Sequence, residues 1–448
     1  MAFWHKGKPL ESVTLFGFGK SNTAVFEYLR KNYPDLKITL RLQKDEKDLP
    51  ADVEVFSGDG LFKNFFEDAV FVSPSIRRDK EEFRGKLLSS DAELFFEKNT
   101  SEVFAVTGSD GKSTTVTLTQ LLLGTRCENA YAVGNIGVPF VKALDYPKGS
   151  LISAELSSFQ LMDFAPKSRR ALISNISPNH LDWHKSLEEY ISAKENILKN
   201  CEEPILFLEN ELSFELLKKY KPYALASATL SENEIKAFKA QFYIYIKDGA
   251  VFANGEKLFE ICELLRNEKH NLKNFLSALA LSYGFFDKSA LSSIARSFSG
   301  LPHRFEFVLE ASGVKFFNSS IDSSPQRTLA TLTSYSGRYV LIMGGRTKMK
   351  NFEILCDIID KNAHALVLTG ENRHEIYRAL KPLSTPIFLE ENFCSAINLG
   401  FSLAKGEYPL ILSPASTSYD AFENFEKRGE VFSEAARSIY KKELKRKV

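Results

Sequence analysis

Short runs of apolar residues alternate along the chain with longer stretches in which apolar positions recur every three or four residues. A short apolar run is typical of a buried strand, whereas the longer spacing is typical of a helix with one apolar face. The predicted strands are 13–16, 36–40, 69–73, 103–107, 151–154, 171–175, 339–343, 363–368 and 410–412. Because strands and helices alternate, the pattern predicts βαβ units with parallel sheets, and therefore an α/β protein.

Two breaks in this pattern are candidate domain boundaries. The polar stretch 97–101 precedes a fresh strand, and the stretch 297–302, which contains a glycine and a proline, follows a helical segment. The chain has 448 residues, which at about 150 residues per domain gives three domains. We expect the domains to cover 1–98, 99–299 and 300–448.

The composition argues against several classes of protein. The 58 lysines and arginines against 57 aspartates and glutamates leave a net charge of +1, which disfavours a dedicated nucleic-acid binder or a membrane-surface protein. No apolar run has the length of a membrane span, and the N-terminus lacks a signal-peptide core, so we expect a cytoplasmic protein. The five cysteines have neither zinc spacing nor the pattern of a disulfide framework. We expect a monomer.

The predicted strand 103–107 leads into a loop with two glycines and then into a helix over 115–123. In this arrangement loop N–H groups converge on phosphate oxygens, Lys112 neutralises the outer phosphates and the Ser113 hydroxyl can hold Mg²⁺. The full pattern has a further glycine where this chain has Val106, so a chance turn is the alternative, but strand, loop and helix in this order favour nucleotide binding. The candidate nucleotide-binding residues are Gly108, Ser109, Asp110, Gly111, Lys112, Ser113 and Thr114.

A second glycine pair follows the first strand. Gly17 and Gly19 have the spacing of a dinucleotide fingerprint, but the third glycine of that fingerprint is replaced by Asn22. The pair therefore predicts a strand–helix turn whose helix N-terminus can meet a phosphate, and it does not imply NAD.

Two further candidate side chains follow strands of the central region. Glu155 comes directly after the strand 151–154, and His180 follows the strand 171–175. Ligands of parallel α/β sheets bind outside the carboxyl ends of the strands. For either residue alone a structural role would be the default, but together they favour a metal–nucleotide site.

The helix after His180 opens with Ser186 and Glu189, which have the spacing of a capping box. Lys194 falls on the apolar stripe of this helix with Tyr190 and Ile191. Periodicity alone favours a lysine whose charged end reaches the surface. The alternative is a buried lysine, whose neutral amine can react with carbon dioxide to give a carbamate that ligates Mg²⁺.

The ordered set of motifs resembles the Mur ligase family over nearly the whole chain. The segments that carry the resemblance are 107–114, 134–137, 155–161, His180 with Asp182, 193–194, 270–274, 300–306 and 413–429. The Leu-Pro-His-Arg-Phe-Glu run at 301–306 and the Ser-Pro-Ala run at 413–415 resemble the member that adds D-glutamate.

The resemblance implies a fold, a reaction and its reactants. The fold would have a Rossmann-like N-terminal domain, a central P-loop ATPase-type domain with a parallel sheet, and a Rossmann-like C-terminal domain. The reaction would join D-glutamate to UDP-N-acetylmuramoyl-L-alanine in peptidoglycan precursor synthesis, with ATP and two Mg²⁺ ions. An acyl phosphate would be the intermediate.

The resemblance also implies roles for single residues. Lys112, His180 and Lys194 would be catalytic. Ser113 and Glu155 would hold the first Mg²⁺, and His180 with carbamylated Lys194 the second. Asn271, Asn274 and Arg304 would contact ATP. The implied substrate contacts are Ser21, Arg41, Asn135, Ser323, Lys348, Ser418, Tyr419 and Phe425.

The chain departs from the family pattern in two loops. The phosphate loop has Ser109 and Asp110 where the family has threonine and asparagine, and this adds a carboxylate near the phosphates. After the strand 314–317, Ser319 and Ile321 replace an aspartate and a lysine. These changes bear on the contacts and leave the reaction class unaffected. The alternatives are another Mur-type or folylpolyglutamate-type ligase, a P-loop ATPase without ligase activity, and a non-enzymatic nucleotide sensor.

Overall fold

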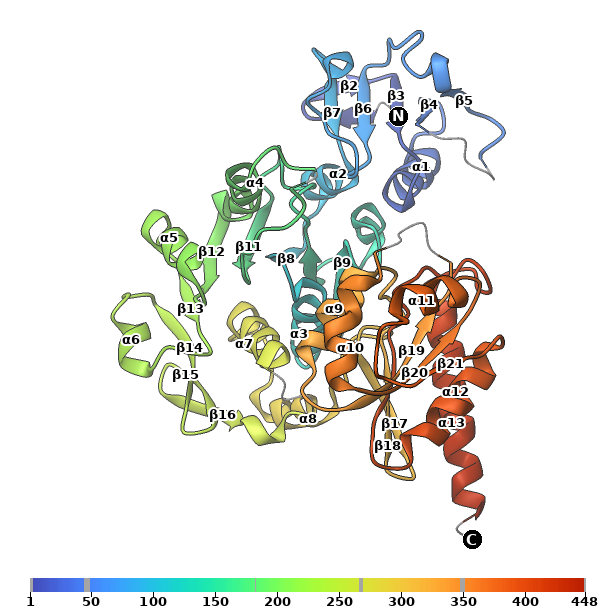
Figure 1. Cartoon of the computed structure of the whole chain (residues 1–448). Helices are drawn as coiled ribbons and strands as arrows, with labels where there is room; N and C mark the ends of the chain where they lie inside the picture. The colour runs from blue at the N-terminus through green and yellow to red at the C-terminus, as the bar shows by residue number, and fades with distance from the viewer. Residues whose placement is uncertain (1–2, 44–48, 182, 266–268, 347–350, 447–448) are drawn as a thin grey trace. The chain divides into compact units, whose positions relative to one another are not determined.

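The computed structural model describes residues 3–43, 49–181, 183–265, 269–346 and 351–446. The chain forms two compact units, 1–297 and 298–448. Three large sheets organise these units, two in the first and one in the second (Figure 1). Within the described ranges, no helix combines the length and the apolar character that crossing a membrane requires.

The first unit begins with a five-stranded parallel sheet in the order β5-β4-β3-β6-β7, preceded by a small antiparallel pair, β1-β2. Apolar clusters cover both faces of the sheet, as expected for parallel strands. The elements are β1 (Phe3–His5), β2 (Lys8–Leu10), β3 (Ser12–Phe16), α1 (Lys20–Asn32), β4 (Lys37–Leu42), β5 (Glu54–Ser57), β6 (Ala69–Val72), β7 (Leu87–Ser89) and α2 (Asp91–Lys98).

The glycine turn after β3 is a structural turn. Gly17 has a φ of 77°, which a side chain would disfavour. The amide nitrogen of Asn22 contacts the carbonyl oxygens of Phe16, Gly17 and Phe71 at 3.2, 2.7 and 3.0 Å. The residue at the third fingerprint position therefore fixes the turn to β6.

The second sheet of this unit has nine strands in the order β16-β15-β14-β13-β12-β11-β8-β10-β9. The strands from β9 to β14 are parallel, and β15 and β16 are antiparallel additions at one edge. The elements are β8 (Glu102–Thr107), α3 (Lys112–Gly124), β9 (Ala130–Gly134), β10 (Leu151–Glu155), β11 (Lys167–Ile173), α4 (Leu187–Lys199), β12 (Asn200–Phe207), α5 (Glu211–Lys219), β13 (Ala224–Ala226), α6 (Glu232–Lys236), β14 (Phe242–Lys247), β15 (Ala250–Ala253), β16 (Glu256–Glu260), α7 (Lys269–Ser282) and α8 (Leu291–Ser297).

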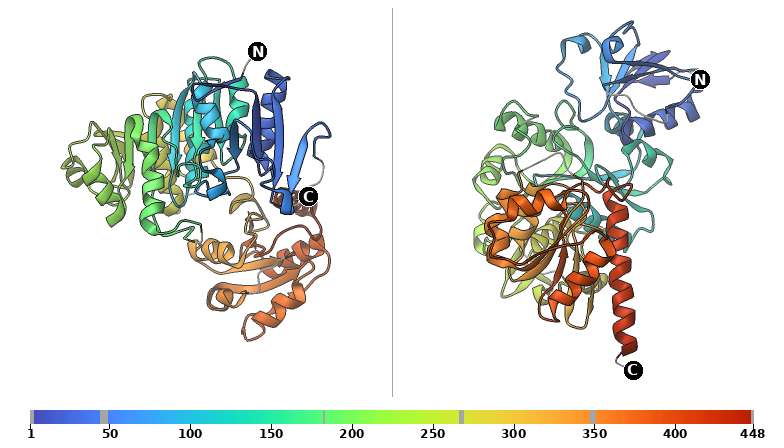
Figure 2. Two further views of the ribbon diagram at one scale, coloured as in Figure 1. Left: turned by 90° about the horizontal axis from the view of Figure 1, so that it is seen from above. Right: turned by 45° about the vertical axis from the view of Figure 1, so that its right-hand side comes forward.

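The second unit is built on a six-stranded sheet in the order β17-β18-β22-β19-β20-β21. Only β17 is antiparallel to its neighbour, and separate apolar clusters cover the two faces. The helices of this unit lie beside the sheet (Figure 2). The elements are β17 (Glu306–Ala311), β18 (Val314–Asn318), α9 (Pro325–Ser334), β19 (Tyr339–Gly344), α10 (Cys356–Asn362), β20 (Ala363–Thr369), α11 (Arg373–Leu380), β21 (Ile387–Leu389), α12 (Phe393–Ala404), β22 (Leu410–Leu412) and α13 (Phe425–Arg446).

The structure confirms the α/β class and all nine predicted strands, with bounds that differ by a few residues. The helix predicted over 115–123 is α3, which begins at Lys112. The two sheets before residue 297 belong to one compact unit, so the predicted boundaries at 98 and 299 stay predictions.

Candidate nucleotide and metal site

Four adjacent strands of the nine-stranded sheet end at one edge. In the order β11-β8-β10-β9, Ile173 pairs with Thr107, and Glu155 pairs with both Val106 and Gly134. The segments that follow these strands therefore emerge side by side. They contain the loop 108–111, Glu155 itself, and the residues after Ile173 and Gly134.

The phosphate loop is held by hydrogen bonds from the neighbouring strand end. Asn175 accepts the backbone N–H groups of Ser109 and Asp110 at 3.0 and 2.9 Å, and its amide donates to the Asp110 carbonyl at 2.9 Å. The Ser109 hydroxyl lies 2.8 Å from the Tyr190 hydroxyl of α4. Gly111, with a φ of 75°, ends the loop as the N-cap of α3. The motif did not reveal Asn175 or Tyr190, because both contacts join distant segments.

Two lysines meet at one carbonyl of this loop. The Lys112 ammonium donates to the carbonyls of Gly108 and Ser109 at 3.0 and 2.9 Å. Lys194 donates to the same Gly108 carbonyl at 2.5 Å, and the Lys194 side chain is only 1% exposed. Burial, and then the charge of Lys112, hold the pKa of Lys194 well below its ordinary value. The interpretation that Lys194 reaches the surface is therefore wrong.

Glu155 is 1% exposed and faces the same edge. Its Oε1 accepts a hydrogen bond from the Asn135 amide at 3.0 Å. Its Oε2 is buried without a hydrogen-bond partner. A buried carboxylate oxygen without a partner is unfavourable unless a cation or a water molecule binds to it. Glu155 therefore has the properties of a metal ligand.

His180 lies on an exposed turn between β11 and α4. Its φ is 55°, and its ring packs edge-on against Phe159 with the ring centroids 5.0 Å apart. The turn is closed because the His180 carbonyl accepts the N–H groups of Trp183 and His184 at 3.1 and 2.9 Å. A metal-ligand role for His180 stays a prediction, and Asp182 is outside the described residues.

The two asparagines expected near ATP are on α7. Asn274 is buried, and its Oδ1 lies 2.0 Å from the position that a Cβ on Gly111 would take. Asn271 is partly exposed one turn earlier on the helix. The phosphate loop therefore packs directly against α7. Arg304 is an exposed residue of the second unit.

Comparison with known proteins gives the family. Residues 106–282 match the model of the Mur ligase middle domain. The UDP-N-acetylmuramoylalanine–D-glutamate ligase of Acetivibrio thermocellus is 35% identical over 96% of this chain and 97% of its own length. The chain belongs to the Mur ligase family.

Solved structures show the same fold. MurF from Acinetobacter baumannii has a TM-score of 0.54 at 12% identity and covers 97% of this Mur ligase and 96% of its own chain. A folylpolyglutamate synthase of Mycobacterium tuberculosis, solved with ADP and AMPPCP, has a TM-score of 0.52 at 13% identity. It covers 76% of this chain and 94% of its own.

Arg41, a candidate substrate contact in the first sheet of this Mur ligase, is bound by the chain itself in this structure. Arg41 is 0% exposed and donates to the carbonyls of Leu61, Lys63 and Asn64 at 2.7, 3.0 and 2.9 Å. It also pairs with Glu67 at 3.3 Å. Arg41 therefore fixes the loop from Leu61 to Glu67, and a substrate contact for Arg41 stays a prediction.

Ser21, the other candidate of the first sheet, is partly exposed at the start of α1. Its hydroxyl contacts the buried carboxylate of Asp91. Burial raises the pKa of Asp91 to about 6. A substrate contact for Ser21 stays a prediction.

The remaining candidates of this Mur ligase are in the second unit. Ser323 follows β18, and Ser418 and Tyr419 follow β22, which is the parallel neighbour of β18. Phe425 begins α13, and its carbonyl accepts the Ser320 hydroxyl at 2.8 Å. These residues thus follow one edge of the sheet, where a ligand of a parallel sheet would bind. Lys348 is outside the described residues.

Arg428 joins these loops and was not found from the sequence. It is 2% exposed and donates to the Ser320 hydroxyl at 2.9 Å, the Ser320 carbonyl at 2.8 Å and the Ser416 carbonyl at 3.0 Å. Burial lowers its pKa to about 10. Asp322, which is also buried, accepts the Ser413 hydroxyl at 2.7 Å. The loop has Ser319 where the family has an aspartate, but it has an aspartate, Asp322, three residues later.

We predict that Gly111→Ala disrupts the phosphate loop. The positive φ and the 2.0 Å approach of Asn274 both oppose a side chain, so we expect a loss of about 1–3 kcal/mol in stability and a sharp loss of ATP affinity. Gly124→Ala, at the other end of α3, is the control, because a Cβ there meets nothing within 4 Å. Thermal unfolding and ATP titration measure both effects. Wild-type ATP affinity in Gly111→Ala would contradict the loop geometry.

We predict that Arg41→Met acts on stability. Removing a buried cation from its carbonyl and carboxylate partners should cost about 3–5 kcal/mol in urea unfolding. Arg30→Met is the control, because Arg30 pairs with a largely exposed Asp52 and should cost under about 1 kcal/mol. A stable Arg41→Met with a raised KM for the nucleotide substrate would instead support the predicted substrate contact.

Proposed function

We propose that this Mur ligase joins D-glutamate to UDP-N-acetylmuramoyl-L-alanine with hydrolysis of ATP, in the synthesis of the peptidoglycan precursor. The observation that carries the proposal is the sheet edge at which the phosphate loop, Glu155 and buried Lys194 meet. The near-full-length match to a ligase of this name supports the choice of substrates.

The reaction needs activation of a carboxylate. An amine cannot displace oxide from a carboxylate at a useful rate, because oxide is a poor leaving group. Transfer of the γ-phosphoryl group of ATP to the substrate carboxylate gives an acyl phosphate. The amine of D-glutamate then attacks its carbonyl carbon, and phosphate leaves from the tetrahedral intermediate. The protein must therefore position three reactants and neutralise the charge on the transferred group.

The phosphate loop can supply this neutralisation. The N-terminus of α3 directly follows the loop, and the positive end of its helix dipole favours an anion there. The Lys112 ammonium, whose partners in this structure are loop carbonyls, can transfer its hydrogen bonds to the outer phosphates. Ser113, which is 5% exposed, is the second residue of α3.

The residues at this edge fit Mg²⁺. We propose that Glu155 and Ser113 hold one ion, and that His180 and the carbamate of Lys194 hold a second. Bound Mg²⁺ would neutralise charge that develops on the phosphoryl oxygens. Among the described residues there is no cluster of three or more histidine, cysteine, aspartate or glutamate side chains. The remaining ligands would thus be hydroxyls, phosphate oxygens, water and a modified side chain.

Lys194 meets the condition for carbamylation. The ammonium groups of Lys112 and Lys194 share the Gly108 carbonyl and repel each other, and the buried Lys194 is the easier to deprotonate. A neutral Lys194 amine forms a nitrogen–carbon bond with carbon dioxide and releases a proton, which leaves a carboxylate. The carbamate of Lys194 is an anion beside the Lys112 ammonium, so it replaces a repulsion between two cations with an attraction.

The amino-acid site is proposed at the edge of the second sheet. Ser323, Lys348, Ser418, Tyr419 and Phe425 would surround D-glutamate. Arg346 can replace the cation lost at Ile321, since its pairing with Glu371 is largely solvent-exposed. The folate-type alternative is disfavoured because a folylpolyglutamate synthase covers 76% of the chain, whereas MurF covers 97%.

We predict that phosphate release from ATP requires both acceptors. Release is measured with each substrate omitted in turn, and then with a panel of D- and L-amino acids. The proposed function expects release only in the complete mixture and the highest kcat/KM with D-glutamate. Equal turnover without acceptors would indicate a P-loop ATPase, and a better amino acid would overturn the specificity.

We predict that Lys194→Arg loses activity by about 100-fold or more while remaining folded, because arginine cannot form the carbamate. A small carboxylic acid added to Lys194→Ala should restore part of the rate by supplying the missing carboxylate. Lys199→Arg, an exposed position on the same helix, is the control and should behave as wild type. A fully active Lys194→Arg would eliminate the carbamate.

A further inference from the structure

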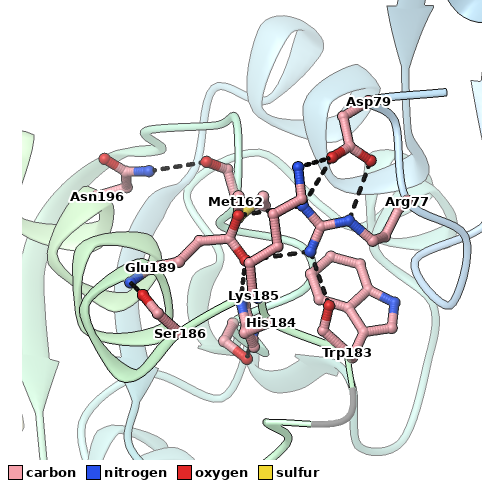
Figure 3. Close-up of polar contacts among 10 residues, drawn as sticks. Arg77, Asp79, Met162, Trp183, His184, Lys185, Ser186, Glu189 and Asn196 are labelled. Carbon is pink, nitrogen blue, oxygen red and sulfur yellow. Dashed lines mark hydrogen bonds and ion pairs between the residues drawn. The ribbon is translucent and has the colours of Figure 1, made fainter. Parts of the chain in front are cut away.

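An arginine from the first sheet of the first unit holds a loop of the nine-stranded sheet. Arg77 follows β6 and donates through Nη1 to the Trp183 carbonyl at 2.7 Å and to Glu189 at 3.1 Å (Figure 3). Its Nη2 donates to Glu189 at 3.1 Å and to Asp79 at 2.9 Å. Lys185 completes the cluster by pairing with Asp79 at 2.6 Å. We call these five residues the Arg77 clasp.

The clasp fixes the turn that presents His180. The carbonyl that Arg77 binds belongs to Trp183, and the N–H of Trp183 closes the turn onto the His180 carbonyl at 3.1 Å. The guanidinium also lies over the Trp183 ring, 4.9 Å from its centroid. The other side of the turn is held by Phe159, whose ring centroid is 4.4 Å from that of Trp183. Phe159 follows Glu155 by four residues, so the turn connects Arg77 to the Glu155 segment.

The clasp also fixes the start of α4. The Ser186 hydroxyl accepts the N–H of Glu189 at 3.2 Å, as a capping box predicts. In a capping box the Glu189 carboxylate would accept a hydrogen bond from the N–H of Ser186. Here it accepts hydrogen bonds from the N–H of Lys185 at 2.7 Å and from both terminal nitrogens of Arg77. These bonds, led by Arg77, lower the pKa of Glu189 to about 2. Lys194 is five residues further along this helix.

Other pairs join the same two sheets without reaching the site. Lys31 pairs with Asp145 and Lys142 with Glu27, and all four side chains are about half exposed. Exposed pairs of this kind contribute little energy and no orientation. Arg77 differs because its planar fork contacts two carboxylates and a carbonyl at fixed angles. Two of its partners, Trp183 and Glu189, lie on the segments that carry His180 and Lys194.

We propose that Arg77 is a positioning residue for ligation, which holds the His180 turn and the start of α4 against the nucleotide-sugar-binding part of the chain. This role rests on the proposed function. It requires that releasing Arg77 displaces the turn and impairs the metal-dependent step. The phosphate loop is also held by Asn175, which lies outside the clasp, so ATP binding should be spared.

The kinetic test uses Arg77→Met with Arg78→Met as its control. Arg78 is the adjacent residue and pairs with Glu93 of α2 at 2.6 Å, so it reports the loss of an ion pair that does not reach the site. We expect Arg77→Met to lose about tenfold or more in kcat and to need more Mg²⁺ for half-activation, with the KM for ATP within about twofold of wild type. Arg77→Lys should recover little, because it lacks the fork.

Glu189→Met is a second, independent test of the clasp. Glu188→Met is its control, because it removes another negative charge from the first turn of α4. If the clasp acts as a unit, Arg77→Met combined with Glu189→Met should lose no more kcat than the worse single variant. Losses that multiply would contradict a shared role. Unchanged kcat and Mg²⁺ dependence in a folded Arg77→Met would overturn the proposal.

A readout without turnover separates this proposal from the function itself. The chain has two tryptophans, so Trp4→Phe leaves Trp183 as the single tryptophan, whose emission is excited selectively beyond the absorption of tyrosine. In that background Glu189→Met should increase acrylamide quenching of Trp183, whereas Glu188→Met should not. Glu189→Met leaves the Arg77 cation in place, so a change reports movement of the turn. Unchanged quenching overturns the clasp. A wild type that ligates nothing overturns the proposed function.

Discussion

One backbone carbonyl, that of Gly108, accepts hydrogen bonds from both Lys112 and Lys194. Two ammonium groups at one acceptor inside a protein repel each other, and burial adds a desolvation cost to Lys194. Burial and the charge of Lys112 together lower the pKa of Lys194, which favours its neutral amine, although Asp110 and Glu155 oppose this shift. The rest of the central site depends on this constraint, since Tyr190 of α4 and Asn175 after β11 hold the loop at the place where the two lysines meet.

The local elements of this fold were predictable because local patterns produce them. Parallel strands buried on both faces are continuous apolar runs, and all nine predicted runs are strands. The missed strands β14, β15 and β16 had a local signal as well. Asp248-Gly249 and Asn254-Gly255 form two-residue turns with positive φ, which join antiparallel strands. The expectation of βαβ units throughout the central region obscured these hairpins.

The site was predictable only where a residue's role follows from its position at a strand end. Glu155 and the phosphate loop are such residues. The motif could not indicate whether Arg41 contacts a ligand or the chain, because its partners are carbonyls 20 to 23 residues along the sequence. Asn175, Arg77 and Arg428 were missed for the same reason. Each joins segments that only the folded chain brings together.

The proposed carbamate and the metal would depend on each other. A protonated Lys194 beside Lys112 repels a cation, whereas its carbamate attracts one, and Glu155 already offers an oxygen that lacks a partner. Metal binding would therefore favour carbamylation, and carbamylation would strengthen metal binding by the same factor. This coupling needs a fixed distance between the turn at His180 and the helix that carries Lys194. The Arg77 clasp contacts both segments, so it acts on the geometry through which the two equilibria are linked.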